Sequence, residues 1–231
     1  PAHDRNAAEL AAALGGLKGP LMKVAQLLST IPDALPPEYA TELAQLQQNA
    51  PPMGWAFVRR RMTTELGPNW QKRFKSFEKE PAAAASLGQV HRAVALDGET
   101  VACKLQYPDM DSAVEADLQQ LGIIFNIHKR MGAAIDTSEI RKEIGMRLRE
   151  ELDYDREARG CRLYANQFRE DPAIRVPEVY RDLSTRRLLT LSWLDGARML
   201  DYTSHPLEER NLLAKTMFRA WWEPFVTIGV I

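Results

Sequence analysis

A single lysine, Lys104, lies inside the apolar segment VACKLQY, whose alternation predicts a β-strand over Thr100 to Gln106. Asp97-Gly98 precedes this strand as a strong signal for a tight turn, and Gln89 to Leu96 is predicted as the first strand of the hairpin. A lysine held on a strand offers a compact positive charge with three N–H donors, which suits phosphate binding. The alternative is a lysine that extends from an edge strand into water.

Alanines occupy the loop before this hairpin, where a phosphate-binding loop normally has glycines. Such loops use glycine because their backbone amides must approach phosphate oxygens closely and adopt unusual dihedral angles. Ala82 to Ala85 carry Cβ atoms that restrict both, and Gly88 alone keeps that freedom. If the loop binds nucleotide, we expect an altered binding mode. The alternative is the ordinary start of a helix or strand, since alanine is the best helix former.

A carboxylate on a helix is expected to hold the lysine ammonium toward phosphate groups. The next helix along the chain, predicted over Asp109 to Met131, offers Glu115 or Asp117. A long helix predicted from about Ser138 to Phe168 is the other source, through its segment EELDYDREA. The residue pattern alone leaves both sources open.

The acidic segment of the long helix presents two faces. Asp153 and Glu157 are four residues apart and share one face, whereas Glu151 is rotated from Asp153 by about 200°. Glu151 and Asp153 are therefore not expected to point the same way. The simplest alternative is a solvated acidic face paired with neighbouring arginines such as Arg147 and Arg156.

Three regions are predicted along the chain. Residues 1–74 form a helical extension punctuated by prolines, in which a helix is predicted roughly over Met53 to Leu66, with Gly67 just beyond it as the C-terminal cap. Residues 75–195 contain the hairpin and the helices after it, and residues 196–231 begin a second helical region. Two further strands are predicted near Ile174 to Tyr180 and Arg187 to Trp193.

The order of these elements indicates the fold class. The predicted order matches that of the small lobe of a protein kinase and the start of its large lobe. This order is a strand, a turn, the strand that carries Lys104, helices, two strands and a helix. VACK also matches the kinase motif VAIK at three of four positions. We therefore predict an α+β fold, a protein-kinase-like small lobe with an N-terminal helical extension and the start of the large lobe. The last helix, from Pro206 to about Gly229, should be kinked at Pro224.

The composition is that of a globular protein, with 45% hydrophobic residues, 26% charged residues and a formal net charge of −1. This balance gives no reason to expect a nucleic-acid partner. Cys103 and Cys161 are far apart and the histidines form no cluster, so we expect neither a disulfide-linked partner nor a metal site. No apolar run approaches the ~20 residues of a membrane span. Both ends are interpreted as boundaries of a fragment or of an ordered region.

Four segments, in this order along the chain, resemble the UbiB-type atypical kinases, the kinase-like proteins of ubiquinone biosynthesis. KVAQ, residues 23–26, is similar to the family's KxGQ motif, with Ala25 in place of its glycine. AAASLGQVH, residues 83–91, is similar to the alanine-rich loop, and VACK is similar to the strand with the nucleotide lysine. ELDYDREA, residues 151–158, is similar to the ExD motif and the glutamate six residues beyond its start.

The resemblance implies a binding site for ATP or ADP in which Lys104 contacts the phosphates and Glu157 holds Lys104. Its alanine-rich cover would consist of Ala83, Ala84, Ala85 and Ser86. A gate over the site would be formed by Lys23, Gln26, Glu151 and Asp153. No segment of this sequence is similar to the family's catalytic loop or metal-binding motif. No catalytic residue is therefore assigned, and Mg²⁺ is expected only together with such residues.

The function that the resemblance implies is that of an ATPase, or of a kinase acting on small molecules or lipids, that supports ubiquinone biosynthesis. Quinone-biosynthesis proteins or lipid are the implied partners. The implied location is the cytoplasm of a bacterium, with peripheral contact to a membrane, or the inside of an organelle in a eukaryote. Two alternatives stay open: a non-catalytic scaffold that binds nucleotide or lipid, and a helical partner-binding domain.

Overall fold

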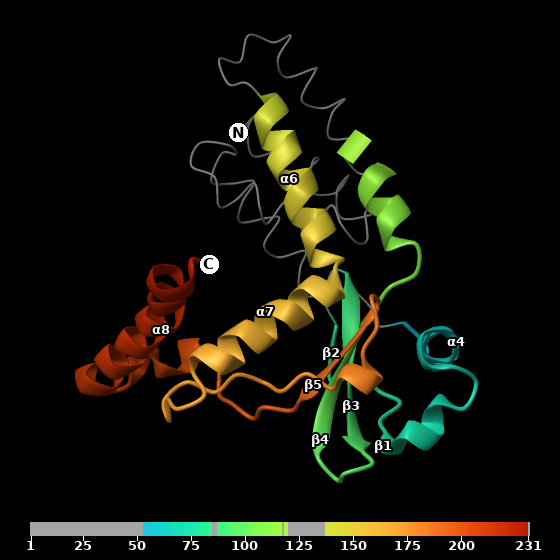
Figure 1. Ribbon diagram of the computed structural model, residues 1–231, viewed down its shortest axis with the longest axis horizontal. Coiled ribbons are helices and arrows are strands. Elements are labelled where there is room, and N and C mark those ends of the chain that lie inside the picture. Colours follow the sequence, from blue (N-terminus) through green and yellow to red (C-terminus); the bar gives the residue numbers. More distant parts are fainter. Residues whose placement is uncertain (1–52, 85–86, 117, 120–136, 231) are drawn as a thin grey trace, which may run out of the picture.

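An antiparallel sheet of five strands organises the chain (Figure 1). The computed structural model describes residues 53–84, 87–116, 118–119 and 137–230. The strand order is β1 (Phe74–Phe77), β3 (Gly88–Ala95), β4 (Thr100–Gln106) and β5 (Leu188–Ser192), and β2 (Ala83–Ala84) also pairs with β3. The hairpin β3–β4 is therefore the centre of the sheet.

The hairpin confirms both predicted strands and their turn. Asp97 accepts the backbone N–H of Glu99 at 2.9 Å, and Gly98 has a φ of 103°, which residues with a Cβ atom rarely adopt. Pairing across the hairpin places Val90 opposite Lys104 and His91 opposite Cys103. The lysine of β4 thus has a fixed register relative to the start of β3.

One face of the sheet is closed by α4 (Trp55–Leu66) and the 3₁₀ helix η2 (Trp70–Arg73). As predicted, α4 ends at Gly67, whose φ is 89°. These elements and alternate residues of the strands form a buried core of Val58, Met62, Leu66, Trp70, Phe74, Ala93, Ala95, Val101, Cys103, Leu105, Leu183 and Leu188. Because successive side chains of a strand point to opposite faces, Lys104 lies on the other face from Cys103 and Leu105.

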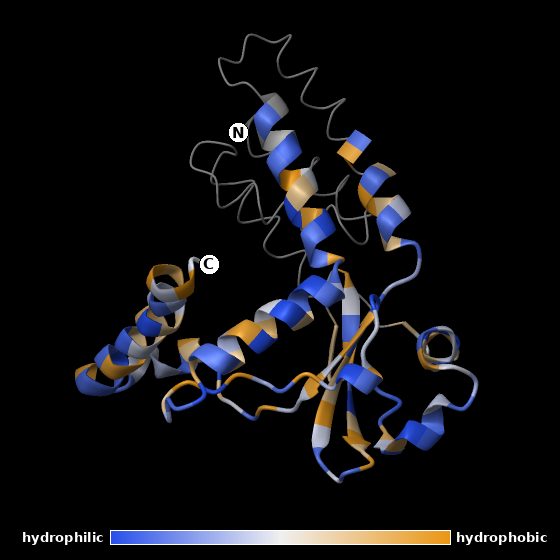
Figure 2. Cartoon of the chain, viewed as in Figure 1, coloured by the Kyte–Doolittle hydropathy of each residue, from blue (hydrophilic) through white to orange (hydrophobic). Residues whose placement is uncertain are grey.

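The opposite face carries α7 (Tyr154–Gln167), which follows α6 (Thr137–Glu151). Tyr154, Ala158 and Leu189 form a small buried cluster here, with Val179 and Leu191 packed against it. Figure 2 shows α7 as mainly hydrophilic and the strands as largely hydrophobic. The buried apolar cluster on the α7 face is therefore much smaller than the core on the α4 face.

The prediction of one continuous helix from Ser138 to Phe168 is wrong. The segment forms two helices, α6 and α7, with a bend between them (Figure 1). Asp153 caps the start of α7 by accepting the backbone N–H of Arg156 at 2.9 Å. Aspartate is favoured at such a position because its carboxylate pairs an amide that the helix leaves without a partner. The buried side chain of Leu152 anchors the junction.

Two strand predictions also need correction. Residues Ile174 to Tyr180 form no strand, and Val179 alone makes an isolated bridge to Leu191. Strand β1 was not predicted, because its sequence FKSF is short and lies directly after η2. The prediction near Arg187 to Trp193 is confirmed as β5, which follows the short 3₁₀ helix η3 (Arg181–Leu183).

The C-terminal part contains η4 (Met199–Ser204) and α8 (Leu207–Ile228). α8 continues through Pro224 and ends at Gly229, which adopts the left-handed conformation. The helix predicted over Asp109 to Met131 is helical at residues 110–116 and 118–119. Asp109 is a turn residue with a φ of 55°, and residues 117 and 120–131, like the KxGQ-like segment, lie outside the described residues.

Candidate functional site

Lys104 and Glu157 form an ion pair between β4 and α7. The Nζ atom of Lys104 lies 2.8 Å from both Oε1 and Oε2 of Glu157. The two side chains are 35% and 40% exposed, and a pair with this much solvent contributes only about 0–1 kcal/mol to stability. The contact is therefore a weak source of folding free energy, although its geometry is bidentate.

Tyr154 provides a surface beneath the ammonium. Its ring centroid lies 4.8 Å from the Nζ atom of Lys104, a distance at which a cation is attracted to an aromatic face. Tyr154 is buried, and its hydroxyl has no hydrogen-bond partner among the described residues. Burial, followed by the charge of Glu157, raises the pKa of this hydroxyl. Tyr154 is not among the predicted site residues, although its position three residues before Glu157 on a helix is a usable signal.

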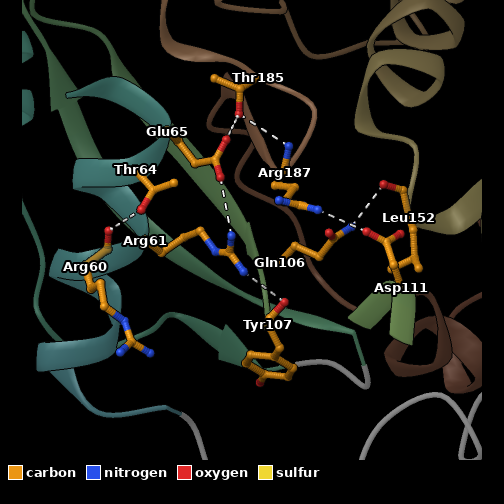
Figure 3. A network of polar contacts seen from close by, with 10 residues as sticks. All are labelled: Arg60, Arg61, Thr64, Glu65, Gln106, Tyr107, Asp111, Leu152, Thr185 and Arg187. Atoms are coloured by element: carbon orange, nitrogen blue, oxygen red, sulfur yellow. Dashed lines mark hydrogen bonds and ion pairs between the residues drawn. The ribbon is translucent and has the colours of Figure 1, made fainter. Parts of the chain in front are cut away.

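A second contact between β4 and the start of α7 lies two residues further along the strand. Gln106 donates from Nε2 to the backbone carbonyl of Leu152 at 3.0 Å, as Figure 3 shows. Lys104 and Gln106 lie on the same face of β4 because side chains alternate. One face of this strand thus holds α7 both at its start and one turn later at Glu157.

Glu115, the other candidate carboxylate in the described part of the chain, pairs with an arginine and not with Lys104. Glu115 accepts hydrogen bonds from Arg149 of α6 at 2.8 and 3.0 Å, and the bond to Arg149 lowers the pKa of that carboxyl. The interpretation that pairs Glu115 with the lysine is therefore wrong. Asp117 lies outside the described residues.

Ala83 and Ala84 of the alanine-rich segment form the short strand β2, and strand β3 lies between them and Lys104. Ala83 pairs with Val90, which in turn pairs with Lys104, so the three residues form one row across the sheet. Ala83 and Ala84 are exposed, and Ala85 and Ser86 lie outside the described residues. The expected role of these four residues in binding nucleotide stays a prediction.

Gly88 follows the alanine-rich segment and is required by packing. A Cβ atom there would lie 2.3 Å from the carbonyl oxygen of Leu105 and 3.1 Å from the hydroxyl of Tyr154. The sequence predicts that this glycine provides conformational freedom for phosphate binding. In the structure, its lack of a side chain permits a close approach to β4. The absence of a side chain lets the start of β3 pack over Tyr154.

Asp153 and Glu151 are separated by the junction between the helices. Asp153 is the N-cap of α7 and lies 3.9 Å from Arg159. The predicted rotation of about 200° between Asp153 and Glu151 holds only within one continuous helix. Because the helix is interrupted between these residues, the prediction of their relative directions is wrong. Lys23 and Gln26, the other members of the expected gate, lie outside the described residues, and the gate stays a prediction.

Buried polar residues on the α4 face were not anticipated. Gln89 accepts the backbone N–H of Met53 at 2.8 Å and donates to the Met53 carbonyl at 3.3 Å. This arrangement directs its NH₂ group to Nε2 of His91, 2.8 Å away, so Nδ1 of His91 carries the proton and donates to the Glu78 carbonyl at 2.9 Å. Burial lowers the pKa of His91, consistent with this neutral tautomer. The network fixes the segment before α4 against the start of β3.

A further polar network joins α4 to the ends of β4 and β5 (Figure 3). Arg61 donates to the Tyr107 carbonyl at 3.2 Å and pairs with Glu65 at 3.4 Å. Glu65 accepts the hydroxyl of Thr185 at 2.6 Å. These contacts hold the helical extension against the sheet end at which α7 begins.

Among the described residues, no three histidine, cysteine or acidic side chains gather as a set of metal ligands. Of the helices in that part, none has the length and apolar character needed to cross a membrane.

Comparison with known proteins identifies the family. Residues 45–231 match the family model of the ABC1 atypical kinase-like domain. The chain is 34% identical over 226 residues to the uncharacterized protein slr0889 of Synechocystis sp., covering 90% of this chain and 54% of that protein. It is 30% identical over 212 residues to the mitochondrial atypical kinase COQ8 of Saccharomyces cerevisiae, covering 91% of this chain and 42% of that protein. The chain thus spans about half the length, or less, of these curated relatives.

A solved structure agrees with this assignment. The Rv3197–erythromycin complex from Mycobacterium tuberculosis matches with a TM-score of 0.61 and 35% sequence identity, covering 91% of this chain and 54% of that one. The predicted α+β, kinase-like fold class and the resemblance to UbiB-type proteins are confirmed. The chain belongs to the ABC1 atypical kinase-like family.

Proposed function

We propose that this chain is the nucleotide-binding part of an atypical kinase or ATPase that supports ubiquinone biosynthesis. The observation that carries the proposal is the bidentate pair of Lys104 and Glu157 over the ring of Tyr154. An exposed ion pair of this kind adds little to stability, so a role in binding explains its geometry better. In kinases, a strand lysine held by a helix glutamate contacts the α- and β-phosphates.

The residues present fit ATP or ADP. Two donors of the Lys104 ammonium are directed to Glu157, and the third is available to a phosphate oxygen. The side chain is 35% exposed, so a ligand can reach it. Ala83, Ala84, Ala85 and Ser86 would cover the nucleotide from the strand next to Val90. We place no Mg²⁺ on the described residues, since they offer no acidic cluster.

The gate belongs to the same proposal. Lys23 and Gln26 would act together with Glu151 and Asp153, which lie at the junction of α6 and α7. A gate at this position would control access to the nucleotide beside Glu157. Its test is whether Lys23→Ala changes nucleotide affinity in the full-length protein.

The names of two relatives bear on the proposed location. COQ8 is described as mitochondrial, and the Arabidopsis thaliana protein ACTIVITY OF BC1 COMPLEX KINASE 8, 36% identical over 183 residues, is described as chloroplastic. We infer work at the surface of a membrane that carries quinone synthesis, with quinone-biosynthesis proteins or lipid as partners. The acceptor would be a small molecule or a lipid.

Fluorescent-nucleotide titration and ATP hydrolysis in the full-length protein test the proposal. Lys104→Ala should weaken nucleotide affinity at least about tenfold, because a charge-assisted hydrogen bond is lost. Glu157→Gln should weaken it less, since the lysine remains. Lys79→Ala is the control: Lys79 is an exposed lysine of the same chain with no partner among the described residues, and this variant should bind normally.

Unchanged affinity in Lys104→Ala would remove the nucleotide assignment. Binding that depends on Lys104 but leads to no hydrolysis would favour the scaffold alternative. Turnover that is lost together with binding would favour the enzyme.

A further inference from the structure

The side of α7 that faces away from Glu157 lines a cavity of about 280 Å³. Asp155 lies three and four residues before Ala158 and Arg159, and these lie four and three residues before Arg162, so the four residues share one side of the helix. The opposite wall comes from the segment after α7, through Val179, Arg181 and Ser184. The volume is close to the lower limit of about 300 Å³ for small-molecule pockets.

The cavity has an apolar base and a cationic rim. Ala158 and Val179 belong to the cluster around Tyr154 that joins α7 to the sheet. Three arginines surround this base, and the side chains of two of them, Arg162 and Arg181, make no hydrogen bond or ion pair with the described residues. The third, Arg159, has only a 3.9 Å contact to Asp153, with side chains 59% and 41% exposed.

Asp155 is the one acidic residue of the lining, so positive charge dominates the cavity. Ser184 adds no charge to the lining. Its hydroxyl donates to the Tyr180 carbonyl at 2.8 Å and accepts the Thr190 N–H at 3.0 Å. Guanidinium groups bind phosphate oxygens in a bidentate manner and are weakly hydrated, which suits a site of this shape.

We propose that this cavity binds the phosphate groups of a small soluble ligand, at a second site separate from Lys104. The ligand carries one or two phosphates that contact Arg159, Arg162 and Arg181, and a small apolar part that rests on Ala158 and Val179. The site does not depend on the proposed nucleotide site, because Glu157 and Lys104 lie on the other side of α7.

Calorimetric titration with inorganic pyrophosphate tests the proposal. The full-length protein is used with Lys104→Met in every sample, so that binding beside Glu157 does not contribute. Arg162→Gln/Arg181→Gln should weaken pyrophosphate binding at least about tenfold, as expected for losing charge-assisted hydrogen bonds. The matched control is Arg175→Gln/Arg186→Gln, which removes two exposed arginines outside the cavity and should bind normally.

Two more variants sharpen the result. Asp155→Asn removes the repulsive carboxylate and should strengthen pyrophosphate binding by about two- to fivefold. Arg162→Lys/Arg181→Lys keeps the charge without the forked geometry and should give an intermediate loss. This variant also serves if the glutamine variant fails to fold.

Three results would overturn the proposal. The first is a lack of pyrophosphate binding by the protein with Lys104→Met alone. The second is equal loss in the cavity variant and its control, which would indicate a non-specific charge effect. The third is arginine-dependent binding to phosphatidic acid vesicles without binding to pyrophosphate, which would assign the arginines to a lipid headgroup.

Discussion

The two faces of the sheet have different tasks. The α4 face is closed by a continuous apolar core in which Val101, Cys103 and Leu105 have no exposed surface. The α7 face has a small apolar cluster, a solvent-accessible ion pair and a cavity lined by arginines. Alternate residues of a single strand, β4, serve both faces. Most of the buried apolar residues lie on the α4 face, so we expect this face to supply most of the stability. The α7 face can therefore carry charged groups.

Neighbouring residues of β4 offer the strongest test of this comparison. Leu105→Ala should lower the free energy of unfolding by about 2–5 kcal/mol, because it leaves a cavity in a fully buried core. Lys104→Ala should lower it by less than about 1 kcal/mol, because its ion pair is exposed. Urea unfolding of the two variants measures the difference. Similar losses in both would show that the α7 face stabilises the fold as much as the α4 face.

Tyr154 tests whether the α7 face positions the lysine. Tyr154→Leu should weaken nucleotide binding about fivefold, because it removes the ring beneath the ammonium. Tyr154→Phe should keep both affinity and stability, because the lost hydroxyl has no partner among the described residues. Fluorescent-nucleotide titration and thermal unfolding are the measurements. Equal affinity in the two variants would leave the tyrosine with a packing role only.

His91 tests the polar part of the α4 face. Burial lowers its pKa in the folded protein, whereas the unfolded chain titrates near 6.5. The neutral ring is therefore favoured by folding. Its contribution is fully present above pH 6.5 and is lost as the pH falls through 6.5 toward the lower folded-state value. The melting temperature, measured between pH 7.5 and 5.5, should fall on acidification.

A pair of histidine variants separates this effect from other titrations. His91→Gln should be less stable at pH 7.5 but should show a flatter dependence on pH. His91→Phe also lacks the titrating ring nitrogens and should show the same flatter dependence on pH. An unchanged slope in His91→Gln would assign the acid sensitivity to other groups.

Local sequence signals were sufficient for the central hairpin. The alternation of Thr100 to Gln106, the turn at Asp97-Gly98 and the end of α4 at Gly67 are all decided by residues close together in the chain. Turn and cap preferences act over a few residues, so pattern and propensity suffice there. The same signals wrongly predicted one long helix. The residue spacing around Asp153 is compatible with a helix interior, and only the folded structure shows that Asp153 is the N-cap of α7.

By itself, the sequence determined the hairpin, the position of Lys104 on it and the kinase-like order of the elements. It left the choice between Glu115 and Glu157 open, and the resemblance to a family favoured Glu157. Only the tertiary structure placed Glu157 against Lys104, Tyr154 beneath the ammonium, and Arg162 and Arg181 in the lining of one cavity. These contacts join residues that are distant along the chain. They depend on how α7 packs on the sheet, which no local pattern encodes.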